Sequence, residues 1–435
     1  MGLRSYFLRK FNSLKIYREM YEQDSAYVLA RLFNKASRPL NFIFLIPFFP
    51  LLLPIVFFIR IVRFFYTIRI GNLESNAIGH FSLPVEIYLS EIDCGIHKNT
   101  RVLDLWYLHK KVCNKALERK WREHLIILPR FMLQPLDLIN QIIPGGGGNE
   151  IPYRRIGDSA YSSANNPHPW QSVDIHDVIS KTNPRIIITK VEKLESEKIL
   201  KEAGFDPDKK YVCIHNRDSA FHSDEISNHR NSSINDFKDA VNYLHSLGYQ
   251  VIRMGAKVQG KLEIKSSLYF DYAQSGIRSE LLDLFLISQC SFFVGNGSGI
   301  DFVPSLFRKM VVYINFSQFG TIPEVSNNSL VLFRKMKVRG RVLSIPEIIE
   351  KGYESYTLMW QFKEAGIELI SNSNQEIRSI ILEAHEKLNN NWNPRIDEEE
   401  NQDLFRKCFH EGAKVNTIIA TIGYDFLRAN LDLLK

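Results

Sequence analysis

The sequence predicts an α/β fold with two Rossmann-like domains that face a cleft, preceded by an N-terminal membrane-associated helical segment. Three observations support this class. From Tyr66 onward, short apolar strands alternate with amphipathic helices, which is typical of a parallel α/β sheet. The alternation restarts at residue 211, and a charge-free hydrophobic stretch at 39–59 precedes it all. A chain of 435 residues also exceeds what one core usually supports, so two domains are expected.

The composition is that of a folded protein with a basic N-terminus. Hydrophobic residues make up 45% and charged residues 24%, which excludes a disordered chain. The net charge is +7. Within residues 1–38, the acidic residues Glu19, Glu22 and Asp24 are outnumbered by Arg4, Arg9, Lys10, Lys15, Arg18, Arg31, Lys35 and Arg38. Because a hydrophobic stretch follows and no nucleic-acid-binding motif is present, we expect an anionic membrane surface rather than nucleic acid as partner.

The hydrophobic stretch from Pro39 to Ile59 predicts membrane attachment. A straight helix of this length, at about 1.5 Å per residue, would just cross a bilayer core of about 30 Å. However, Pro47, Pro50 and Pro54 each remove a helical hydrogen bond, and both flanks are basic. A re-entrant or interfacial segment with both ends on the cytoplasmic face fits best. A true span and a buried core helix are the alternatives.

The five cysteines are odd in number, far apart and in no metal-binding spacing. They are expected to be reduced, mostly buried thiols in a reducing compartment. They are Cys94, Cys113, Cys213, Cys290 and Cys408.

The alternation divides the chain into four regions. We expect an attachment region at 1–65, an N-terminal Rossmann-like domain at 66–200, a C-terminal Rossmann-like domain at 201–335 and a helical region at 336–435 that packs back on the domains. In the first domain, strands are expected at 66–70, 102–107 and 124–128, and helices at about 84–92, 112–122 and 134–142. The glycine run 145–148 is expected to be a flexible linker or a mobile loop near the cleft. In the second domain, strands are expected at 211–217, 249–255, 267–273, 291–295 and 310–316, with helices at 234–247, 279–289 and 300–308.

A polar cluster at the end of the strand 211–217 is the first candidate site. Arg217 could clamp a diphosphate through paired hydrogen bonds, and His215 and Asn216 could contact phosphate or ribose. Asp218 could orient Arg217. A surface turn with an Arg–Asp pair is the structural alternative. A metal site made of His215, Asp218, His222 and Asp224 matches no standard ligand spacing.

A glycine loop is the second candidate site. Gly295, Gly297, Ser298 and Gly299 lie between a strand and a predicted helix, where backbone N–H groups and the helix N-terminus could bind phosphate. The loop is neither a Walker A motif nor a regular dinucleotide-binding motif.

Weaker candidates lie nearby. Arg253 and Gly255 end the next strand, where Arg253 could contact phosphate or sugar. Asp271 and Asp283 could contact base or ribose, although a cap or a solvated face is the simpler interpretation of each.

In the first domain, a glycine turn made by Gly71 and Gly79 is expected to follow the first strand and face the cleft. His80 or Glu86 could then be the general base that takes the acceptor hydroxyl proton.

Several of these segments, in order, resemble a family of bacterial glycosyltransferases found with surface-polysaccharide genes. The matching segments are IGHFSLPVEIYLSE (78–91), VCIHNRD (212–218), GYQVIRMG (248–255), FFVGNGSG (292–299) and GYDFLRANLDLL (423–434). The resemblance covers about 66–435. More distantly, HNRD is similar to the His-x-Arg motif of fucosyltransferases with the GT-B fold, whose arginine contacts the donor diphosphate. By similarity that role falls on Arg217. The double arginine often seen in that motif is missing, so fucose or GDP specificity does not carry over.

The resemblance implies a metal-independent, GT-B-like glycosyltransferase that needs no cofactor besides its nucleotide-sugar donor. The acceptor is then expected on the domain 66–200 and the nucleotide-sugar on the domain 201–335. The expected acceptor is a glycan or lipid-linked glycan at the cytoplasmic face of the inner membrane. A sugar-nucleotide epimerase would also place α/β halves around a nucleotide, but it would not need a membrane segment. A non-catalytic membrane scaffold for polysaccharide assembly is the third interpretation.

Overall fold

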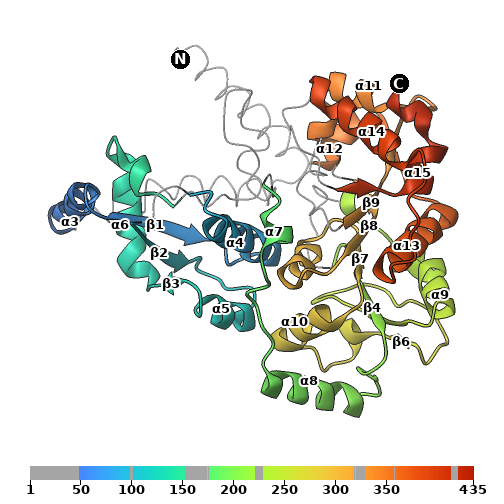
Figure 1. Ribbon diagram of the computed structural model, residues 1–435, viewed down its shortest axis with the longest axis horizontal. Helices are drawn as coiled ribbons and strands as arrows, with labels where there is room; N and C mark the ends of the chain where they lie inside the picture. The colour runs from blue at the N-terminus through green and yellow to red at the C-terminus, as the bar shows by residue number, and fades with distance from the viewer. Residues whose placement is uncertain are drawn as a thin grey trace.

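The computed structural model describes residues 49–97, 101–151, 174, 176–220, 229–317, 319, 329–356, 358–412 and 420–435. It consists of two α/β halves, each built on a parallel sheet with helices packed against it (Figure 1). The predicted α/β class with two parallel sheets is therefore confirmed. The segment that carries α7 (Val178–Lys181) and α8 (Lys190–Glu202) runs from the N-terminal half to the larger C-terminal half.

The N-terminal half is built on three parallel strands in the order β1-β2-β3. Thr67 pairs with Val102, and Leu105 pairs with Ile126. All three predicted strands are present. The elements are α3 (Phe49–Val62), β1 (Thr67–Leu73), α4 (Ile78–Asp93), β2 (Val102–Leu108), α5 (Lys115–Trp121), β3 (Ile126–Ile127), α6 (Arg130–Ile142) and the 3-10 helix η2 (Gly146–Asn149).

Two details of this half differ from the prediction. Gly71 lies inside β1 rather than in a turn, and a Cβ there would lie 2.9 Å from Cδ1 of Ile151. The first helix after β1 begins at Ile78, six residues before the predicted start at 84, so Pro84 lies inside α4. Gly79 and His80 therefore belong to the first turn of a helix, where backbone N–H groups lack helical partners.

The glycine run 145–148 is neither a flexible linker nor a loop at the cleft. Most of it forms η2, which packs beside the amino end of β1: the side chain of Asn149 donates a hydrogen bond to the carbonyl of Ile68 at 2.9 Å. A Cβ on Gly146 would lie 2.0 Å from the carbonyl oxygen of Asn140. Close packing against α6 therefore accounts for the glycine at position 146.

The C-terminal half is built on seven parallel strands in the order β13-β9-β8-β7-β4-β5-β6. Its strands are β4 (Tyr211–Ile214), β5 (Gln250–Arg253), β6 (Tyr269–Phe270), β7 (Phe293–Gly295), β8 (Val311–Phe316), β9 (Ser329–Phe333) and β13 (Thr421–Ile422). Its helices before residue 310 are η4 (Ile234–Phe237), α9 (Lys238–Ser246), η5 (Tyr272–Gln274), α10 (Glu280–Gln289) and η6 (Gly299–Phe307). All the predicted strands of this domain are present. The predicted helix at 300–308 is a 3-10 helix, with Pro304 inside it.

The C-terminal region is mainly helical and packs back on this sheet, as α13 contacts α9, α15 and β9. It also contributes β13 at the sheet edge and a small antiparallel sheet in the order β11-β10-β12. Its elements are β10 (Lys335–Val338), β11 (Arg341–Val342), α11 (Ile345–Glu350), η8 (Tyr353–Ser355), α12 (Met359–Glu364), β12 (Ile367–Ile370), α13 (Asn374–Leu388), α14 (Glu398–Gly412), α15 (Tyr424–Ala429) and η9 (Leu431–Leu434).

One hydrophobic cluster runs through both halves, from Phe81 and Trp121 in the first to Phe285 and Val303 in the second. The halves are therefore packed together rather than merely linked. The five cysteines are free, with Cys213 and Cys290 buried, Cys113 and Cys408 half-buried, and Cys94 exposed. The expectation that the cysteines are mostly buried is therefore confirmed only for Cys213 and Cys290, and it is wrong for Cys94.

The described part of the hydrophobic stretch forms α3, with Pro54 inside the helix. Residues 39–48 and the basic segment 1–38 lie outside the described residues. Within the part of the chain that the structure describes, no helix is both long enough and apolar enough to cross a bilayer. α3 packs against α6 and buries Val56 and Ile59.

Candidate functional site

The candidate site lies where β4 and β7 stand side by side. The chain winds outward from β4 through β5 to β6, returns to β7 beside β4, and then winds outward on the other side through β8 and β9. In such sheets, ligands bind at the carboxyl ends of the strands where the winding direction changes. His215, Asn216 and Arg217 follow β4, and Asn296 to Gly299 follow β7, so the structure brings the two predicted motifs together at the point of the sheet edge where folds of this kind form a ligand-binding crevice.

Asn296 connects the two motifs. Its Oδ1 accepts a hydrogen bond from the backbone N–H of Arg217 at 2.9 Å. Its Nδ2 donates to the carbonyl of Arg230 and to Oγ of Ser232, both at 3.0 Å. Asn216 donates to the carbonyl of Ser232 at 3.3 Å. Two buried asparagines thus hold the segment 229–233 against the ends of both strands.

Three arginines converge on this segment. Arg334 directly follows β9 and donates to the carbonyls of His229 at 3.0 Å and Asn231 at 3.2 Å. Nε of Arg217 donates to Oδ1 of Asn231 at 3.2 Å. Burial, followed by the positive charges of Arg230, Arg217 and Arg334, lowers the pKa of His229 to about 3. Burial is the largest cause of this lowered pKa, and the three positive charges add to it. Such a concentration of positive charge suits an anionic ligand.

The glycine loop binds a carboxylate of the chain itself. Oδ2 of Asp301 accepts hydrogen bonds from the N–H groups of Gly297 at 2.9 Å and Ser298 at 2.8 Å. A Cβ on Gly295 would lie 2.4 Å from this oxygen, so glycine is needed there. These two N–H groups are therefore not open to a phosphate, and the predicted phosphate cradle is wrong in this respect.

Asp301 also faces His215. Its second oxygen, Oδ1, lies 3.5 Å from Nδ1 of His215, and both side chains are buried. One carboxylate thus positions the glycine loop and the histidine at the end of β4. Gly255 lies on the other side of this ring, since a Cβ there would lie 3.8 Å from Cδ2 of His215.

Arg253 does not reach the crevice. It is fully buried, donates to the carbonyls of Gly260 at 2.9 Å and Gln259 at 2.8 Å, and pairs with Asp271 at 3.3 Å. Oδ2 of Asp218 accepts from the N–H of Gln259 at 2.6 Å, and Oδ1 accepts from the N–H of Ala220 at 2.9 Å. Arg253, Asp271 and Asp218 therefore fix the loop 256–261, and Asp218 does not orient Arg217 as predicted.

Asp283 is likewise internal. It accepts hydrogen bonds from Oη of Tyr272 at 3.0 Å and from Arg278 at 2.6 Å. Burial raises the pKa of this carboxyl group, with Arg278 and Tyr272 acting in the opposite direction. The predicted contact with base or ribose does not fit this position, because both oxygens are held inside the protein.

The N-terminal half meets the glycine loop at α4. A Cβ on Gly79 would lie 3.0 Å from Cα of Gly299, so the two glycines allow the backbones of the two halves to touch. His80 is the next residue of the first turn of α4 and is half-buried. The structure therefore brings the predicted acceptor-side histidine beside the glycine loop of the other half.

Glu86 holds the two halves together instead of facing an acceptor. It is fully buried, and its Oε1 accepts from Arg308 at 2.8 Å and from Arg185 at 3.1 Å. Arg308 ends η6, and it also donates to the carbonyl of Thr182 at 3.1 Å. A carboxylate shared by two arginines has no access to a substrate hydroxyl, so the structure does not support Glu86 as the general base.

Sequence reasoning missed three residues of this site: Arg230, Arg334 and Asp301. Arg230 and Arg334 lie outside the strand-end motifs on which the prediction rested. Arg334 bonds the carbonyl of His229, 105 positions earlier, so only the strand order could reveal this contact. Asp301 offered a local signal, because an acidic residue two positions after a glycine loop is well placed to accept its N–H groups.

Within the described residues, no group of three or more histidines, cysteines, aspartates and glutamates is placed to hold a metal ion. His222 and Asp224, members of the alternative metal site, lie outside the described residues. The metal independence expected from the resemblance stays a prediction.

No family model and no curated protein matches the chain. Among solved structures, it is similar to an ADP-heptose lipopolysaccharide heptosyltransferase II from E. coli, with 13% identity, 74% of this chain and 98% of that chain covered, and a TM-score of 0.41. It is similar to a glycosyl transferase of family 9 from Veillonella parvula, with 10% identity, coverage of 74% and 97%, and a TM-score of 0.42. A dodecameric iron-containing heptosyltransferase, TibC, matches with 14% identity, coverage of 73% and 76%, and a TM-score of 0.37. These TM-scores are too low for the function of this chain to be inferred from the similar structures.

Proposed function

We propose that the chain is a glycosyltransferase that moves a sugar from a nucleotide-sugar donor to a glycan or lipid-linked glycan in surface-polysaccharide synthesis. One observation carries the proposal: Arg217, Arg230 and Arg334 converge where the winding of the parallel sheet changes direction. A diphosphate supplies the negative charge and the paired oxygen acceptors that arginine side chains bind best. The crevice lies opposite the first turn of α4, so an acceptor bound to the N-terminal half would face the donor.

In the proposed reaction, the acceptor hydroxyl oxygen attacks the anomeric carbon of the donor sugar and forms the new glycosidic bond. The bond between that carbon and the diphosphate oxygen breaks, and the nucleoside diphosphate leaves with the electron pair. The three arginines stabilise the charge on the leaving group, a role that divalent ions fill in other enzymes. The hydroxyl proton goes to a base, for which we propose His80.

His215 is the proposed contact to a donor phosphate or ribose. Oδ1 of Asp301 lies 3.5 Å from Nδ1 of this ring, so Nε2 is the ring nitrogen that we propose contacts the donor. The fixed position of Asp301 beneath the glycine loop keeps this histidine in place. Ser298 and Gly299 complete the proposed donor side of the crevice.

Attachment to the cytoplasmic face of the inner membrane belongs to the same proposal. It rests on the basic segment 1–38 and the hydrophobic stretch 39–59, and it would bring the enzyme to a lipid-linked acceptor.

The test is binding of UDP-, GDP-, ADP-, CMP- and dTDP-sugars to the purified full chain, with EDTA present, followed by an assay for released nucleotide with membrane lipid extract as acceptor. The proposal predicts tight binding of one donor class, loss of that binding in Arg217→Ala, and sugar transfer that depends on acceptor. Epimerised donor without transfer would indicate the epimerase alternative. Absence of binding to folded protein would overturn the proposal in favour of a scaffold.

A further inference from the structure

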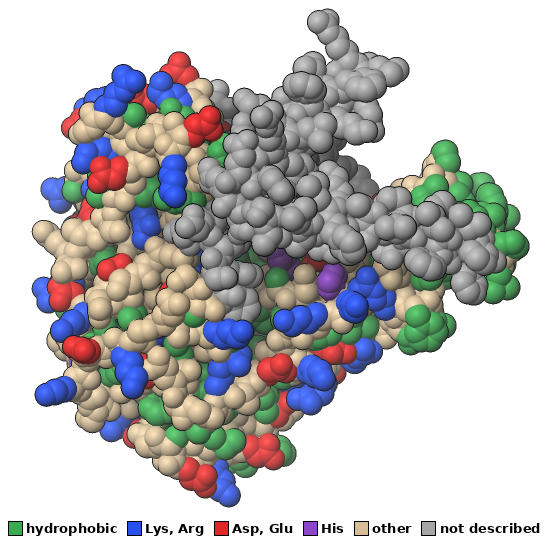
Figure 2. Space-filling model, turned by 180° about the vertical axis from the view of Figure 1, so that it is seen from behind, with side chains coloured by type: hydrophobic (Ala, Val, Ile, Leu, Met, Phe, Trp, Pro, Cys, Tyr) green, Lys and Arg blue, Asp and Glu red, His purple; other side chains and the backbone are tan. Residues whose placement is uncertain are grey.

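The end of the N-terminal half that lies away from the C-terminal half carries an exposed hydrophobic surface (Figures 1 and 2). Two helices that are distant in sequence form it together. α3 and α6 pack against each other through Ile59 and Leu133, which are buried. The outward apolar side chains are Leu51, Phe57, Phe58, Ile61, Phe64 and Phe65 on and after α3, and Phe131, Met132 and Ile142 on α6. We name these residues the α3–α6 surface.

The exposure of this surface is unusual for a water-soluble face. Phe64 is 90% exposed and Phe131 is 79% exposed. Contiguous large apolar side chains of this kind mark sites of interaction with a partner or a membrane. Hydrogen bonds also fix α3 against α6. Arg60, in the last turn of α3, donates to the carbonyls of Asn140 near the end of α6 and of Pro144 just after it, both at 2.8 Å.

The charges around the surface are positive. α3 contains no acidic residue, and the acidic residue of α6, Asp137, is buried and accepts a hydrogen bond from Oη of Tyr107 at 2.6 Å. Arg63 follows α3 and is exposed, and it forms no hydrogen bond or ion pair with the described residues. Aromatic side chains next to free arginines are the usual composition of segments that lie in the headgroup region of a bilayer.

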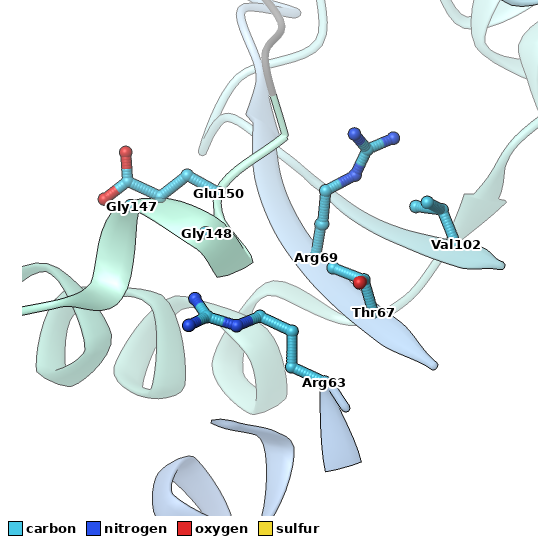
Figure 3. Close-up of a pocket in the computed structure, with 7 residues that line it drawn as sticks. All are labelled: Arg63, Thr67, Arg69, Val102, Gly147, Gly148 and Glu150. Carbon is cyan, nitrogen blue, oxygen red and sulfur yellow. The ribbon is translucent and has the colours of Figure 1, made fainter. Parts of the chain in front are cut away.

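A cavity of about 510 Å³ opens beside Arg63, at the amino ends of β1 and β2 (Figure 3). Arg69 also lines this cavity, but its guanidinium is bound to Asp104 and to Tyr88. Glu150 contributes a negative charge to the lining. Arg63 lies across Gly148, where a Cβ would be 2.0 Å from Nη1. The cavity can therefore receive a lipid headgroup, with Arg63 as the cation for its phosphate.

We propose that the α3–α6 surface inserts into the headgroup region of an anionic lipid bilayer and that Arg63 contacts a lipid phosphate there. Charge complementarity favours a bilayer as the occupant, and so does continuity with residues 39–48, which are apolar and precede α3 directly. The inference deepens the membrane attachment that is part of the proposed function. It adds a defined headgroup contact and α6, a helix that the pattern of the sequence does not connect with the membrane.

The test is co-sedimentation of the nucleotide-free full chain with vesicles of phosphatidylcholine alone or mixed with phosphatidylglycerol. Replacing Phe131 and Met132 together with glutamate should weaken binding about tenfold or more, because charged side chains would enter the headgroup region. The matched control replaces Val191 and Leu194 of α8 with glutamate; they are 64% and 67% exposed but lie on another element, so binding should not change. Arg63→Glu should remove most of the gain that phosphatidylglycerol provides.

Phe131→Trp gives a second measurement that does not depend on weakened binding. Vesicles that carry brominated lipid chains should quench the fluorescence of this tryptophan and leave that of Leu194→Trp unchanged. Unchanged vesicle binding by the α6 double variant would overturn the proposal, since attachment would then rest on residues 1–59 alone. The parent chain could also form a dimer in lipid-free solution. If the α6 double variant dissociates this dimer but binds vesicles as the parent does, a second copy of the chain covers the surface, which would also overturn the proposal. Donor binding is measured separately, so either proposal can fail without the other.

Discussion

At the scale of single residues, Asp301 explains most of the candidate site. Its buried carboxylate accepts two N–H groups of the glycine loop and faces His215, so loop and histidine share one support. The glycines of this loop are needed for close packing within the protein. A Cβ on Gly295 would collide with Asp301, and Gly299 packs directly against the backbone of Gly79. A glycine-rich loop after a strand therefore did not indicate open phosphate-binding N–H groups.

Gly295→Ala tests this arrangement. The new Cβ would lie 2.4 Å from Asp301, so we expect displacement of the carboxylate, a loss of roughly 1–3 kcal/mol in unfolding free energy and weaker donor binding. Chemical denaturation and donor titration measure the two effects. Gly147→Ala is the matched control, because its Cβ would meet no atom within 4 Å. Equal stability of both variants would contradict the role assigned to Asp301.

The pH dependence of stability tests the arginine cluster. The folded-state pKa of His229 is about 3, below the value of about 6.5 for an unfolded histidine. As pH falls below 6.5, the unfolded state therefore binds a proton that the folded state does not, and the free energy of unfolding falls by up to about 1.4 kcal/mol per pH unit. Between pH 7 and pH 5, the free energy of unfolding of the His229→Gln variant should therefore fall by about 2 kcal/mol less than that of the parent chain.

Urea unfolding at the two pH values gives the comparison. Acidic groups such as Asp283 and Glu383, whose pKa values are raised by burial, are present in both proteins and cancel in the difference. An identical loss of stability in parent and variant would mean that burial and the neighbouring arginines do not lower the pKa of His229.

At the scale of elements, the contact between α4 and η6 sets the relation of the two halves. Gly79 and Gly299 touch at the crevice, and about two turns further along α4, Glu86 binds Arg308 and Arg185. The same helix that carries His80 is thus anchored to the C-terminal half by a buried ion pair.

Glu86→Gln should weaken the attachment of α4 to the C-terminal half and lower the free energy of unfolding. Two half-buried arginines would lose the counter-charge of Glu86, although Arg185 also pairs with Asp93, and breaking a buried pair from one side costs up to about 3–5 kcal/mol. Thermal and urea unfolding should both report the loss. Glu118→Gln, which removes a partly exposed i,i+4 pair with Arg122, should change stability by about 0.5 kcal/mol or less. A small effect at Glu86 would contradict the idea that this pair holds the halves together.

β9 and β13 were not predicted, but the other strands of the two parallel sheets could be predicted from the sequence because buried parallel strands are short apolar runs between turn residues. Val212 to Ile214 and Phe293 to Val294 are such runs. The order of strands could not be predicted, because it depends on contacts between segments far apart in the chain. For this reason Arg217 was identified from its place at a strand end, whereas Arg230 and Arg334 were not. Arg253 was misjudged for the converse reason: it also ends a strand, but the loop 256–261 folds over it.

At the scale of the whole molecule, the α3–α6 surface and the crevice lie at opposite ends of the N-terminal sheet (Figure 1). β1 connects the two ends, and its seven residues at about 3.3 Å each span roughly 23 Å. If the α3–α6 surface rests in a bilayer, a lipid-linked acceptor must extend about that far to reach His80.

We therefore expect a lipid-linked acceptor with several sugars to be used better than one with a single sugar. The measurement is the initial rate of transfer to lipid-linked acceptors of increasing length, with the matching free oligosaccharides as controls. A preference for the single-sugar lipid would contradict this orientation on the membrane.

The central claim is that the arginine cluster binds the diphosphate of a donor, with Arg217 and Arg230 as the contacts and Arg334 holding the segment 229–231 in place. Titration calorimetry with UDP, GDP and ADP tests this claim most directly. The account predicts that one of these nucleotides binds to the parent chain, that Arg217→Ala and Arg230→Ala each weaken binding about tenfold to a hundredfold, and that added salt reduces the difference. Arg341→Ala, which removes an exposed arginine paired with Glu347, should bind like the parent. Binding that is unchanged in both Arg217→Ala and Arg230→Ala would contradict the claim and move the donor site away from the junction of β4 and β7.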